Sequence, residues 1–597
     1  MSYQARERSG NDAAVALPGR HASLGKMVAV VDAACRLGPR PVMLRLADRA
    51  LRAVGLPQAR LQDRPAPAGR FLPTVAPPPP GLCRAEAARV LRAAAALPTH
   101  PDWHRRFDPK AHALSIELHR HGGARPVWEA SRLAAVPLLV QAARLDPGGP
   151  HLARAEALLG LWCLENPPFR GVGWACGQEA AFRALHLALA LALLDADRDP
   201  PPAARALLSL CARRIAATPL YALAQDNNHP VSEAAGAFAC ALLLGRDSRG
   251  AAARLSARVA RLVAPDGGFA QVSPGYARLL LDTLSVAEWL RRRHGAPAFP
   301  APLAARAAAL AGWLHRITEP GTGATPALGL EDGSALADLS LRGPADARGS
   351  VERAARLFAC SGADMPEDPG CAWLGLRRRR LSLVRARRWQ ASGTAGWCEA
   401  GAAALLRTGP LRFRPGQCDL LHVSLRDGAT WVIRDGGTGS YDPPAEWWWA
   451  KMSGAAGHNA PVFDGAEPMR RAGRFLLSRW PTVSALRDGA ALRDQRGNEV
   501  LREIAVAGRA WTVRDRLSGP FSRVAWHWRL CPGEWSLTPD GAQGPAARIT
   551  VESDAPLRLE LVTGWESPAY GAVRPARVLR VEASAPVAQV VTRIALP

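Results

Sequence analysis

The apolar residues in the first two thirds of the chain recur at helical spacing. From about residue 84 to residue 365, apolar side chains return every three or four positions in segments such as RAEAARVLRAAAALP, WEASRLAAVPLLVQAARL and YARLLLDTLSVAEWLRRR. That spacing places them on one face of an α-helix. Pro, Gly and Asp in the intervening loops separate one helix from the next. Such a succession of helices predicts a bundle, a solenoid or an α/α toroid, and the lack of a fixed repeat period disfavours the common solenoids.

After about residue 375 the pattern changes to short alternating or β-branched runs. Examples are DLLHVSL, TWVIRD, RVAWHWRL and VAQVVTRIAL, with turn residues between them. Alternation with a period of two indicates strands, and this spacing of strands and turns is typical of an antiparallel sandwich. Helices first and strands second predict two domains packed side by side. We therefore expect a helical domain over 84–370 and a β-sandwich domain over 371–597.

Residues 1–83 precede these domains as a leader. We expect one or two short helices between Leu24 and Val54, followed by a stiff linker at the Pro-rich sequence VAPPPPG. No apolar run reaches the roughly 18 residues that a membrane-spanning helix needs, so no membrane span is expected. The longest apolar run, LHLALALALL, ends in charged residues and predicts a buried helix instead.

The composition limits the kinds of partner. The formal net charge of +24 comes almost entirely from arginine. A basic surface attracts polyanions, which include nucleic acid, anionic lipid and acidic polysaccharide. No helix-turn-helix, zinc-finger or RNA-binding signature accompanies the charge, so a nucleic-acid partner is not expected. The 11 cysteines are scattered without close pairs or metal-finger spacing, which suits a reducing compartment.

Four helical motifs and one C-terminal segment carry the candidate chemistry. The helical motifs are Trp128-Glu129-Ala130-Ser131-Arg132, Trp174 followed by Gln178-Glu179 and Arg183, Asn227-Asn228-His229 followed by Glu233, and Asp266-Gly267-Gly268-Phe269 followed by Tyr276. The C-terminal segment covers residues 414–464. Together, in this order and spacing, they resemble the heparinase II/III-like polysaccharide lyases over roughly residues 85 to 590.

The resemblance implies a fold and an activity. The fold would be an incomplete α/α toroid followed by an antiparallel β-sandwich, with the substrate cleft between them. The activity would be the β-elimination of an acidic, uronate-containing polysaccharide such as a bacterial exopolysaccharide or a glycosaminoglycan. The acidic polysaccharide is then the expected partner, and the oligomeric state stays open.

The chemistry of that reaction can be argued separately. Removing the proton on carbon 5 of a uronate requires a base, and the leaving glycosidic oxygen requires an acid. Negative charge on the neighbouring carboxylate must be stabilised by hydrogen-bond donors or cations. We expect Asn228 and His229 to supply donors, and His229 can also be the base. Tyr276 can be the acid, or both base and acid.

A wider group of residues is expected to contact the substrate: Trp128, Arg132, Trp174, Gln178, Glu179, Arg183, Glu233 and His422. Each has a structural alternative. The two asparagines before His229 can cap the helix that follows them, and Tyr276 and the two tryptophans can belong to the core. Arg132 and Arg183 can pair with Glu129 and Glu179 at helical spacing.

The C-terminal segment resembles a zinc site of the family, with one difference. Asp435 and His458 match two of its ligands, but Gln417 stands where the family has a histidine. A neutral amide is a poor zinc ligand. On a regular strand, Cys418 and His422 would point to the opposite face from Gln417. The sequence therefore predicts no complete site, and a structural zinc ion at Asp435 and His458 is the one candidate cofactor.

Two other functions compete with a lyase. A catalytically degenerate member could bind exopolysaccharide during its assembly, which the difference at Gln417 favours. A glycoside hydrolase on the same scaffold would need two carboxylates about 5–10 Å apart across the bond, and Glu129, Glu179, Glu233 and Asp226 show no obvious pairing. The N-terminus has no clear signal peptide, which predicts a cytoplasmic location, with the periplasm or cell envelope as the alternative.

Overall fold

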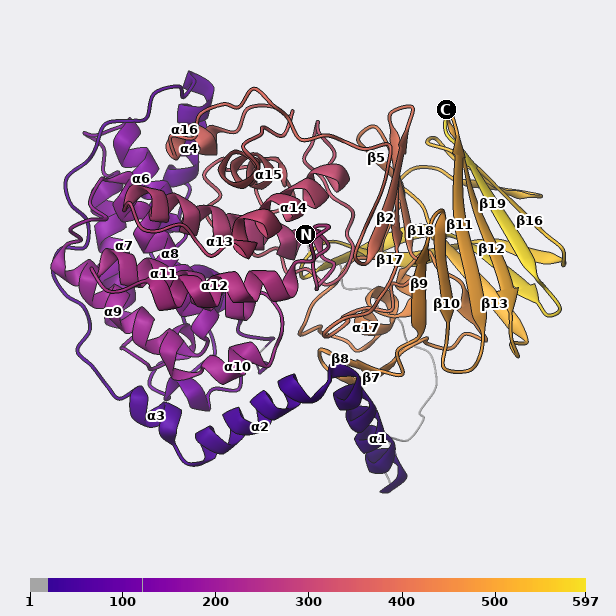
Figure 1. Ribbon diagram of the computed structural model, residues 1–597, viewed down its shortest axis with the longest axis horizontal. Helices are drawn as coiled ribbons and strands as arrows, with labels where there is room; N and C mark the ends of the chain where they lie inside the picture. The colour runs from indigo at the N-terminus through magenta and orange to yellow at the C-terminus, as the bar shows by residue number, and fades with distance from the viewer. Residues whose placement is uncertain (1–19, 121) are drawn as a thin grey trace, which may run out of the picture.

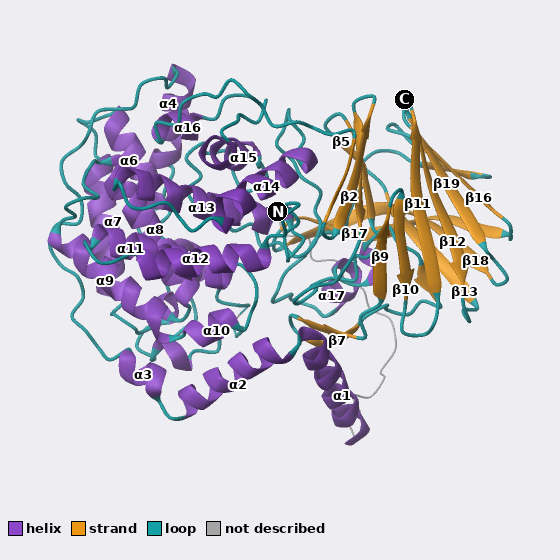
Figure 2. Cartoon of the chain, in the orientation of Figure 1, coloured by secondary structure: helices purple, strands orange, loops and turns teal. Residues whose placement is uncertain are grey.

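Helices and strands occupy separate halves of the molecule. The computed structural model describes residues 20–597 except residue 121, and Figures 1 and 2 show the helical region beside the strand region. The helices before the first strand are α1 (Arg20–Leu37), α2 (Pro39–Ala53), α3 (Leu56–Arg60), α4 (Arg84–Ala95), α5 (Arg125–Ser131), α6 (Ala135–Leu145), α7 (His151–Glu165), α8 (Gly177–Leu193), α9 (Pro202–Ala217), α10 (Pro219–Leu223), α11 (His229–Leu243), α12 (Arg249–Leu262), α13 (Pro274–Arg293), α14 (Pro302–Ile317), α15 (Arg348–Ala354) and α16 (Pro369–Trp373). No helix of the described residues is long and apolar enough to cross a membrane.

Helix α8 lies at the centre of the helical domain. Every residue of α8 is buried, which confirms the predicted buried helix. Helices α6, α9 and α11 pack around it. Gly236 of α11 allows the closest approach, because a Cβ at that position would lie 2.6 Å from the Cβ of Ala181 on α8. An all-round apolar helix is stable only when neighbours cover every side, so α8 organises the helices around it.

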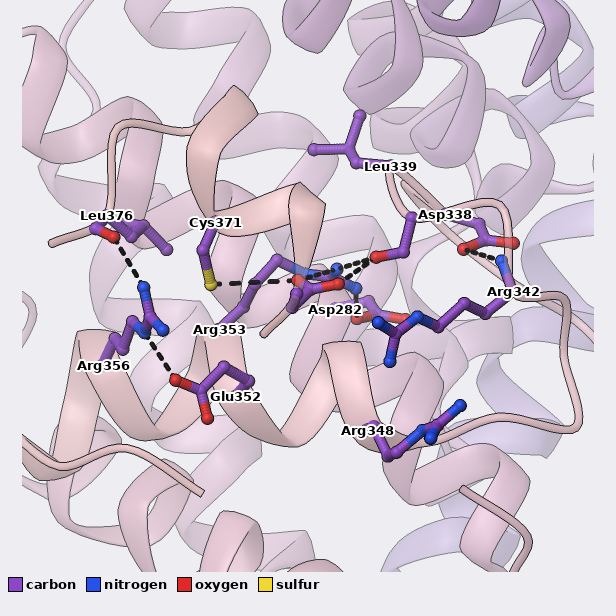
Figure 3. A network of polar contacts seen from close by, with 12 residues as sticks. Asp282, Asp338, Leu339, Arg342, Arg348, Glu352, Arg353, Arg356, Cys371 and Leu376 are labelled. Atoms are coloured by element: carbon purple, nitrogen blue, oxygen red, sulfur yellow. Dashed lines mark hydrogen bonds and ion pairs between the residues drawn. The ribbon is translucent and has the colours of Figure 1, made fainter. Parts of the chain in front are cut away.

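A buried ionic network joins three elements at the end of the helical domain (Figure 3). Arg353 of α15 donates to Asp282 of α13 at 3.0 Å and to Asp368, just before α16, at 2.9 Å. One turn later, Arg356 donates to Glu352 at 2.6 Å and to the carbonyl of Leu376 at 2.8 Å. Buried charges are tolerated when they are paired in this way. The network fixes the chain just before it enters the strand domain.

The strand domain begins at β1 and consists of antiparallel sheets. Its strands are β1 (Arg388–Ala391), β2 (Thr394–Glu399), β3 (Ala402–Arg407), β4 (Val423–Asp427), β5 (Thr430–Ile433), β6 (Val462–Phe463), β7 (Arg470–Gly473), β8 (Leu476–Ser478), β9 (Thr482–Leu486), β10 (Gly489–Arg493), β11 (Glu499–Ala507), β12 (Ala510–Ser518), β13 (Arg523–Arg529), β14 (Ser536–Thr538), β15 (Gly541–Gln543), β16 (Arg548–Ser553), β17 (Leu557–Ala569), β18 (Ala572–Ser584) and β19 (Gln589–Ala595). A short helix, α17 (Trp447–Met452), lies between β5 and β6.

The sheets share one core. Strands β1 to β5 form a five-stranded sheet in sequence order, an eight-stranded sheet has the order β14-β15-β16-β19-β12-β11-β10-β9, and a four-stranded sheet has the order β17-β18-β13-β6. Leu425, Val513 and Trp526, one from each of these sheets, belong to the same buried cluster. Alternate residues of β12 face this core, as expected for a strand with period-two patterning.

Helices α1 and α2 connect the two domains from outside. Helix α1 packs against β7 and β8, and α2 packs against α10 of the helical domain. Figure 1 shows both helices along one edge of the molecule, with α1 projecting from it. The expected helices between Leu24 and Val54 are therefore present, and they span from one domain to the other.

Candidate functional site

A cavity of about 180 Å³ lies where the helical domain meets the strand domain. Seven of the residues singled out from the sequence line it: Trp128, Arg132, Gln178, Glu179, Asn228, His229 and Tyr276. Arg414, Tyr441 and Tyr570 enter it from the strand domain. The helical motifs are far apart in the sequence, so the fold brings them together at one place.

The loop before α11 is held by hydrogen bonds from several directions. Asp226 has a left-handed backbone (φ 45°) and pairs with Arg261 at 2.6 Å. Asn228 donates through its backbone N–H to the Gln271 side chain at 3.0 Å and through its side-chain amide to Gln178 at 2.7 Å. Asn228 thus occupies the N-cap position of α11 without making a side-chain cap. Its amide is turned toward Gln178 at the cavity wall.

His229 is a neutral imidazole at ordinary pH. Burial lowers its pKa to about 4. Its Nδ1 lies 3.8 Å from the Cys176 Sγ, and its backbone N–H donates to the Asn227 side chain at 3.0 Å. Nε2 has no hydrogen-bond partner among the described residues, so one nitrogen of a neutral ring is available to a ligand in the cavity.

Tyr276 reaches the strand domain from the first turn of α13. Ser273 caps that helix and accepts the backbone N–H of Tyr276 at 3.2 Å. The Tyr276 hydroxyl lies 2.8 Å from the hydroxyl of Tyr441. Burial raises the pKa of Tyr276 well above its usual value. The phenol is therefore protonated at neutral pH and can donate a proton.

Arg414 is the cation in the cavity that has no carboxylate partner. Its Nε donates to the carbonyl of Gln225 at 3.1 Å, and among residues 20–597, with residue 121 left aside, no carboxylate oxygen lies within ion-pair distance of its guanidinium. Burial lowers its pKa, and the side chain keeps its charge because an arginine guanidinium is not deprotonated in proteins. Arg414 therefore offers an uncompensated guanidinium to an anionic ligand.

The carboxylates that line the cavity are all paired with arginines. Glu179 pairs with Arg132 at 2.6 Å, and Asp332 pairs with Arg125 at 3.2 Å. Asp226 pairs with Arg261, and Asp442 pairs with Arg474. Burial alone would raise the pKa of Asp332, but the Arg125 and Arg132 guanidiniums hold it below its usual value. None of these groups is a free carboxylic acid.

A second cluster lies in the core of the strand domain. His422, Asp435 and His458 are buried, and their ligand atoms all lie within 4.8 Å of one another. The Asp435 Oδ2 is 2.9 Å from the His458 Nδ1 and 3.4 Å from the His422 Nδ1. The His458 Nε2 is buried without a partner in the described structure. Two imidazoles and a carboxylate converging on one point form a donor set that zinc takes in proteins.

The strand domain matches the model of a known family. Residues 385–595 match the family described as Heparinase II/III-like, C-terminal. The strand domain is therefore similar to the C-terminal domain of that family. No curated protein matches the chain by sequence.

The chain as a whole has the fold of solved heparinase structures. It aligns with heparinase III at a TM-score of 0.59 and 13% identity, over 94% of this chain and 92% of that chain. It aligns with heparan sulfate lyase HepC from Pedobacter heparinus at a TM-score of 0.54 and 15% identity, over 92% of this chain and 88% of that chain. At such identities the likeness establishes the fold. The predicted resemblance and the predicted toroid followed by a β-sandwich are confirmed.

Two residues predicted to touch substrate lie in the core of the helical domain. The side chains of Trp174 and Arg183 are 0% exposed. The Arg183 guanidinium lies over both the Trp162 and Trp174 rings, at 4.1 and 4.6 Å from their centroids, and donates to the carbonyls of Ser131 and Gly173. The prediction of substrate contact is wrong for both, because neither side chain is exposed to a ligand.

Glu233 also lies outside the cavity. It is buried, and a Cβ on Gly177 would lie 2.5 Å from its Oε1, so the carboxyl fits against the first residue of α8. Burial raises its pKa to about 8. The prediction that Glu233 contacts substrate is wrong, and the side chain next to the His229 imidazole is that of Cys176.

Arg132 and Glu179 line the cavity but bind each other. Arg132 makes two hydrogen bonds to Glu179, at 2.6 and 2.9 Å, and it also pairs with Glu129 at 3.4 Å. The alternative of helical pairing is thus correct for Arg132 and Glu129. Trp128 is half-buried and donates from its indole to the carbonyl of Val172 at 2.9 Å. These residues form the wall around Asn228 and His229.

The sequence analysis also placed His422 wrongly. A turn with Leu421 at φ 63° precedes β4, which begins at Val423, so residues 417–422 do not form a regular strand. His422 therefore joins Asp435 and His458, and it is too buried to contact a polysaccharide. Its Nδ1 accepts the backbone N–H of Asn459 at 3.0 Å, a hydrogen bond that a bound ion would replace. Gln417 donates instead to the carbonyl of Gly437 at 3.0 Å.

Three residues of the site were missed in the sequence. Arg414 precedes the first predicted strand of the C-terminal segment, and Tyr441 and Tyr570 lie in loops whose place depends on the contact between the two domains. The chain contains only 5 tyrosines, and four of them, Tyr221, Tyr276, Tyr441 and Tyr570, line this cavity. The sequence shows that tyrosine is rare but not that these residues lie together.

Proposed function

We propose that the protein is a polysaccharide lyase that cleaves an acidic, uronate-containing polysaccharide by β-elimination. The observation that carries the proposal is the content of the cavity. A neutral imidazole, a protonated phenol and an unpaired guanidinium line it, while its carboxylates are bound to arginines. The names of the fold relatives, heparinase III and a heparan sulfate lyase, agree with a substrate of this class.

Arg414 would bind the uronate carboxylate. A guanidinium forms paired hydrogen bonds with a carboxylate and stabilises the negative charge that grows on it when the neighbouring proton leaves. The Asn228 amide, held by Gln178 at 2.7 Å, would donate to the same group with its remaining N–H. Both groups are in place before substrate arrives, so little reorganisation is required.

His229 would be the base. Its neutral ring can accept the proton from carbon 5 through Nε2, and the negative substrate beside it would raise its pKa from the low value of the free protein. As that proton leaves, a double bond forms between carbons 4 and 5 and the bond from carbon 4 to the glycosidic oxygen breaks. The leaving oxygen takes a proton.

Tyr276 would donate that proton. Its raised pKa keeps the phenol protonated at rest, which favours the role of acid over that of base. The Tyr441 hydroxyl, 2.8 Å away, can donate to the phenolate that forms. Water then restores both His229 and Tyr276 to their resting protonation states.

Hydrolysis is disfavoured by the same geometry. A glycoside hydrolase needs one carboxylic acid and one carboxylate across the bond. Here Glu179, Asp226, Asp332 and Asp442 are each paired with an arginine. No carboxyl group of the cavity is placed as a proton donor.

The test is an assay on a panel of uronate polymers that follows the ultraviolet absorbance of the unsaturated product. We expect cleavage of at least one polymer, and Tyr276→Phe and His229→Ala should each lower the rate by about 10²–10⁴-fold. His100→Ala, at an exposed site, serves as the control. Binding without absorbance change would favour a degenerate binding protein, and new reducing ends without absorbance would favour a hydrolase.

We further propose that His422, Asp435 and His458 bind a zinc ion with a structural role. The ion would tie the start of the loop after β5 to the segment before β6, and it would supply no step of the reaction. Protein purified without chelator should contain stoichiometric zinc. Both His422→Gln and His458→Gln should lower the zinc content, whereas His100→Gln should leave it unchanged. Metal-free wild-type protein with an unaltered melting temperature would refute the site.

A further inference from the structure

Helices α1 and α2 carry their large apolar side chains on the outside. More than half of the exposed large apolar side chains among the described residues lie between Met27 and Leu56. On α1, Met27 is 59% exposed and Val31 is 57% exposed. On α2, Met43 is 63% exposed and Leu46 is 52% exposed. Single exposed apolar residues are ordinary, but a concentration on two adjacent helices indicates an interaction surface.

The inner face of α1 is made of small residues. Ala29 and Ala33 are buried, and they pack with Ala472 and Leu476 of the β7–β8 hairpin. Asp32 fixes this contact by accepting the backbone N–H of Arg479 at 2.7 Å. A helix that only covered a protein core would place its largest apolar side chains inward. In α1 the alanines face inward, and the valines and the methionine face outward.

The inner face of α2 is polar. Asp48 is buried and pairs with Arg52 at 3.0 Å and with Arg45 at 3.4 Å. Both arginines lie over the ring of Tyr221, with Arg45 at 5.0 Å and Arg52 at 5.3 Å from its centroid. Apart from Leu37 at the end of α1 and Pro41 in the first turn of α2, both helices thus contact the protein through small or polar groups and leave most of their large apolar groups exposed.

The charge of the segment indicates what covers this surface. Residues 20–60 contain eight arginines and lysines and two aspartates. Both aspartates, Asp32 and Asp48, are paired with arginines. A second copy of the chain would bring the same excess of positive charge against itself, on a protein of net charge +24, and would be repelled. Anionic headgroups attract basic segments that lie near the bilayer surface.

We propose that α1 and α2 form a docking surface for an anionic lipid bilayer. Helices of this composition lie in the plane of the bilayer interface, with apolar side chains inserted and basic side chains among the headgroups. Figure 1 shows both helices on one edge of the molecule, where α1 projects beyond the β7–β8 hairpin on which it packs. No spanning segment is involved, and the inference does not depend on the lyase activity.

Flotation of the full-length protein with lipid vesicles tests the proposal. Vesicles of phosphatidylglycerol and phosphatidylcholine in about equal parts should bind the protein, and binding should weaken as salt is added. Vesicles of phosphatidylcholine alone should bind less. The variant with Met27→Ser, Val31→Ser and Leu46→Ser should lose at least about tenfold in vesicle partition. These positions are exposed, so the variant should keep the melting temperature of the wild type.

A matched variant controls for loss of apolar surface in general. Leu381, Val384 and Leu537 are exposed apolar residues elsewhere in the chain, and replacing all three with serine should leave flotation unchanged. The proposal is overturned if the wild type does not float with anionic vesicles, or if both variants float equally well. A concentration-dependent dimer that the Met27/Val31/Leu46 variant abolishes, without vesicle binding, would assign the surface to a second copy instead.

Discussion

Three arginines have different roles because different groups surround each guanidinium in the fold. Arg132 is neutralised by Glu179. Arg183 lies over two tryptophan rings and donates to two backbone carbonyls. Arg414 keeps its charge without a carboxylate partner in the part of the chain that the structure describes. Only the last arrangement leaves a guanidinium available to bind an anion, because a cation already paired gains little from a second partner.

Replacing Arg414 should therefore affect turnover more than stability. Arg414→Ala should lower kcat/KM on a cleaved polymer by about 10²–10³-fold, as expected when a donor to the developing charge is removed. The neighbouring Arg412→Ala is the control, because Arg412 is exposed and lies over the Phe413 ring. Equal activity of the two variants would show that Arg414 does not bind the carboxylate.

At the scale of elements, the sequence predicted the short motifs at helix starts. It did not predict which side chains contact each other in the fold. Asn228 and His229 begin α11 and Tyr276 lies in the first turn of α13, so their motifs located them correctly at the ends of helices. The spacing of apolar residues does not show which helices pack against each other. The contact of Arg183 with the Trp162 and Trp174 rings could therefore not be predicted. His422 was misplaced because one turn, with Leu421 at φ 63°, interrupts the strand period.

The network around Arg353 should contribute strongly to stability. Arg353→Met removes the partner of Asp282 and Asp368 and leaves two carboxyl groups buried, where burial already raises the pKa of Asp282. Breaking a buried ion pair on one side costs about 3–5 kcal/mol of unfolding free energy. Arg249→Met, which removes an exposed pair with Asp247, should have a much smaller effect because solvent screens that pair. Urea denaturation measures both values, and equal effects would refute the role of the network.

At the scale of the whole molecule, several histidines are folded in their neutral form. Burial lowers the pKa of His186, His315 and His527 to about 4 in each case. The two domains share this property, since the first two histidines lie among the helices and the third lies in β13. The stability of both domains should therefore depend on pH.

Stability should fall as the pH is lowered from about 6.5 to 4. The unfolded chain takes up protons at these histidines below its ordinary pKa of about 6.5, whereas the folded chain takes them up only near 4, so acid favours unfolding. Thermal melting at pH 7.5 and pH 5 should differ by more than about 5 °C. His315→Gln should reduce the difference, and His100→Gln should not. A melting temperature independent of pH would contradict the buried neutral state.

The hydrogen bond between Tyr276 and Tyr441 joins a helix of one domain to a loop of the other. The proposed acid and the group that would stabilise its anion therefore belong to different folding units. Either half, produced alone, would lack part of the proposed reaction centre. If the separated halves are mixed, the activity that returns would measure how well the two domains associate. The reaction would then serve as a probe of domain assembly.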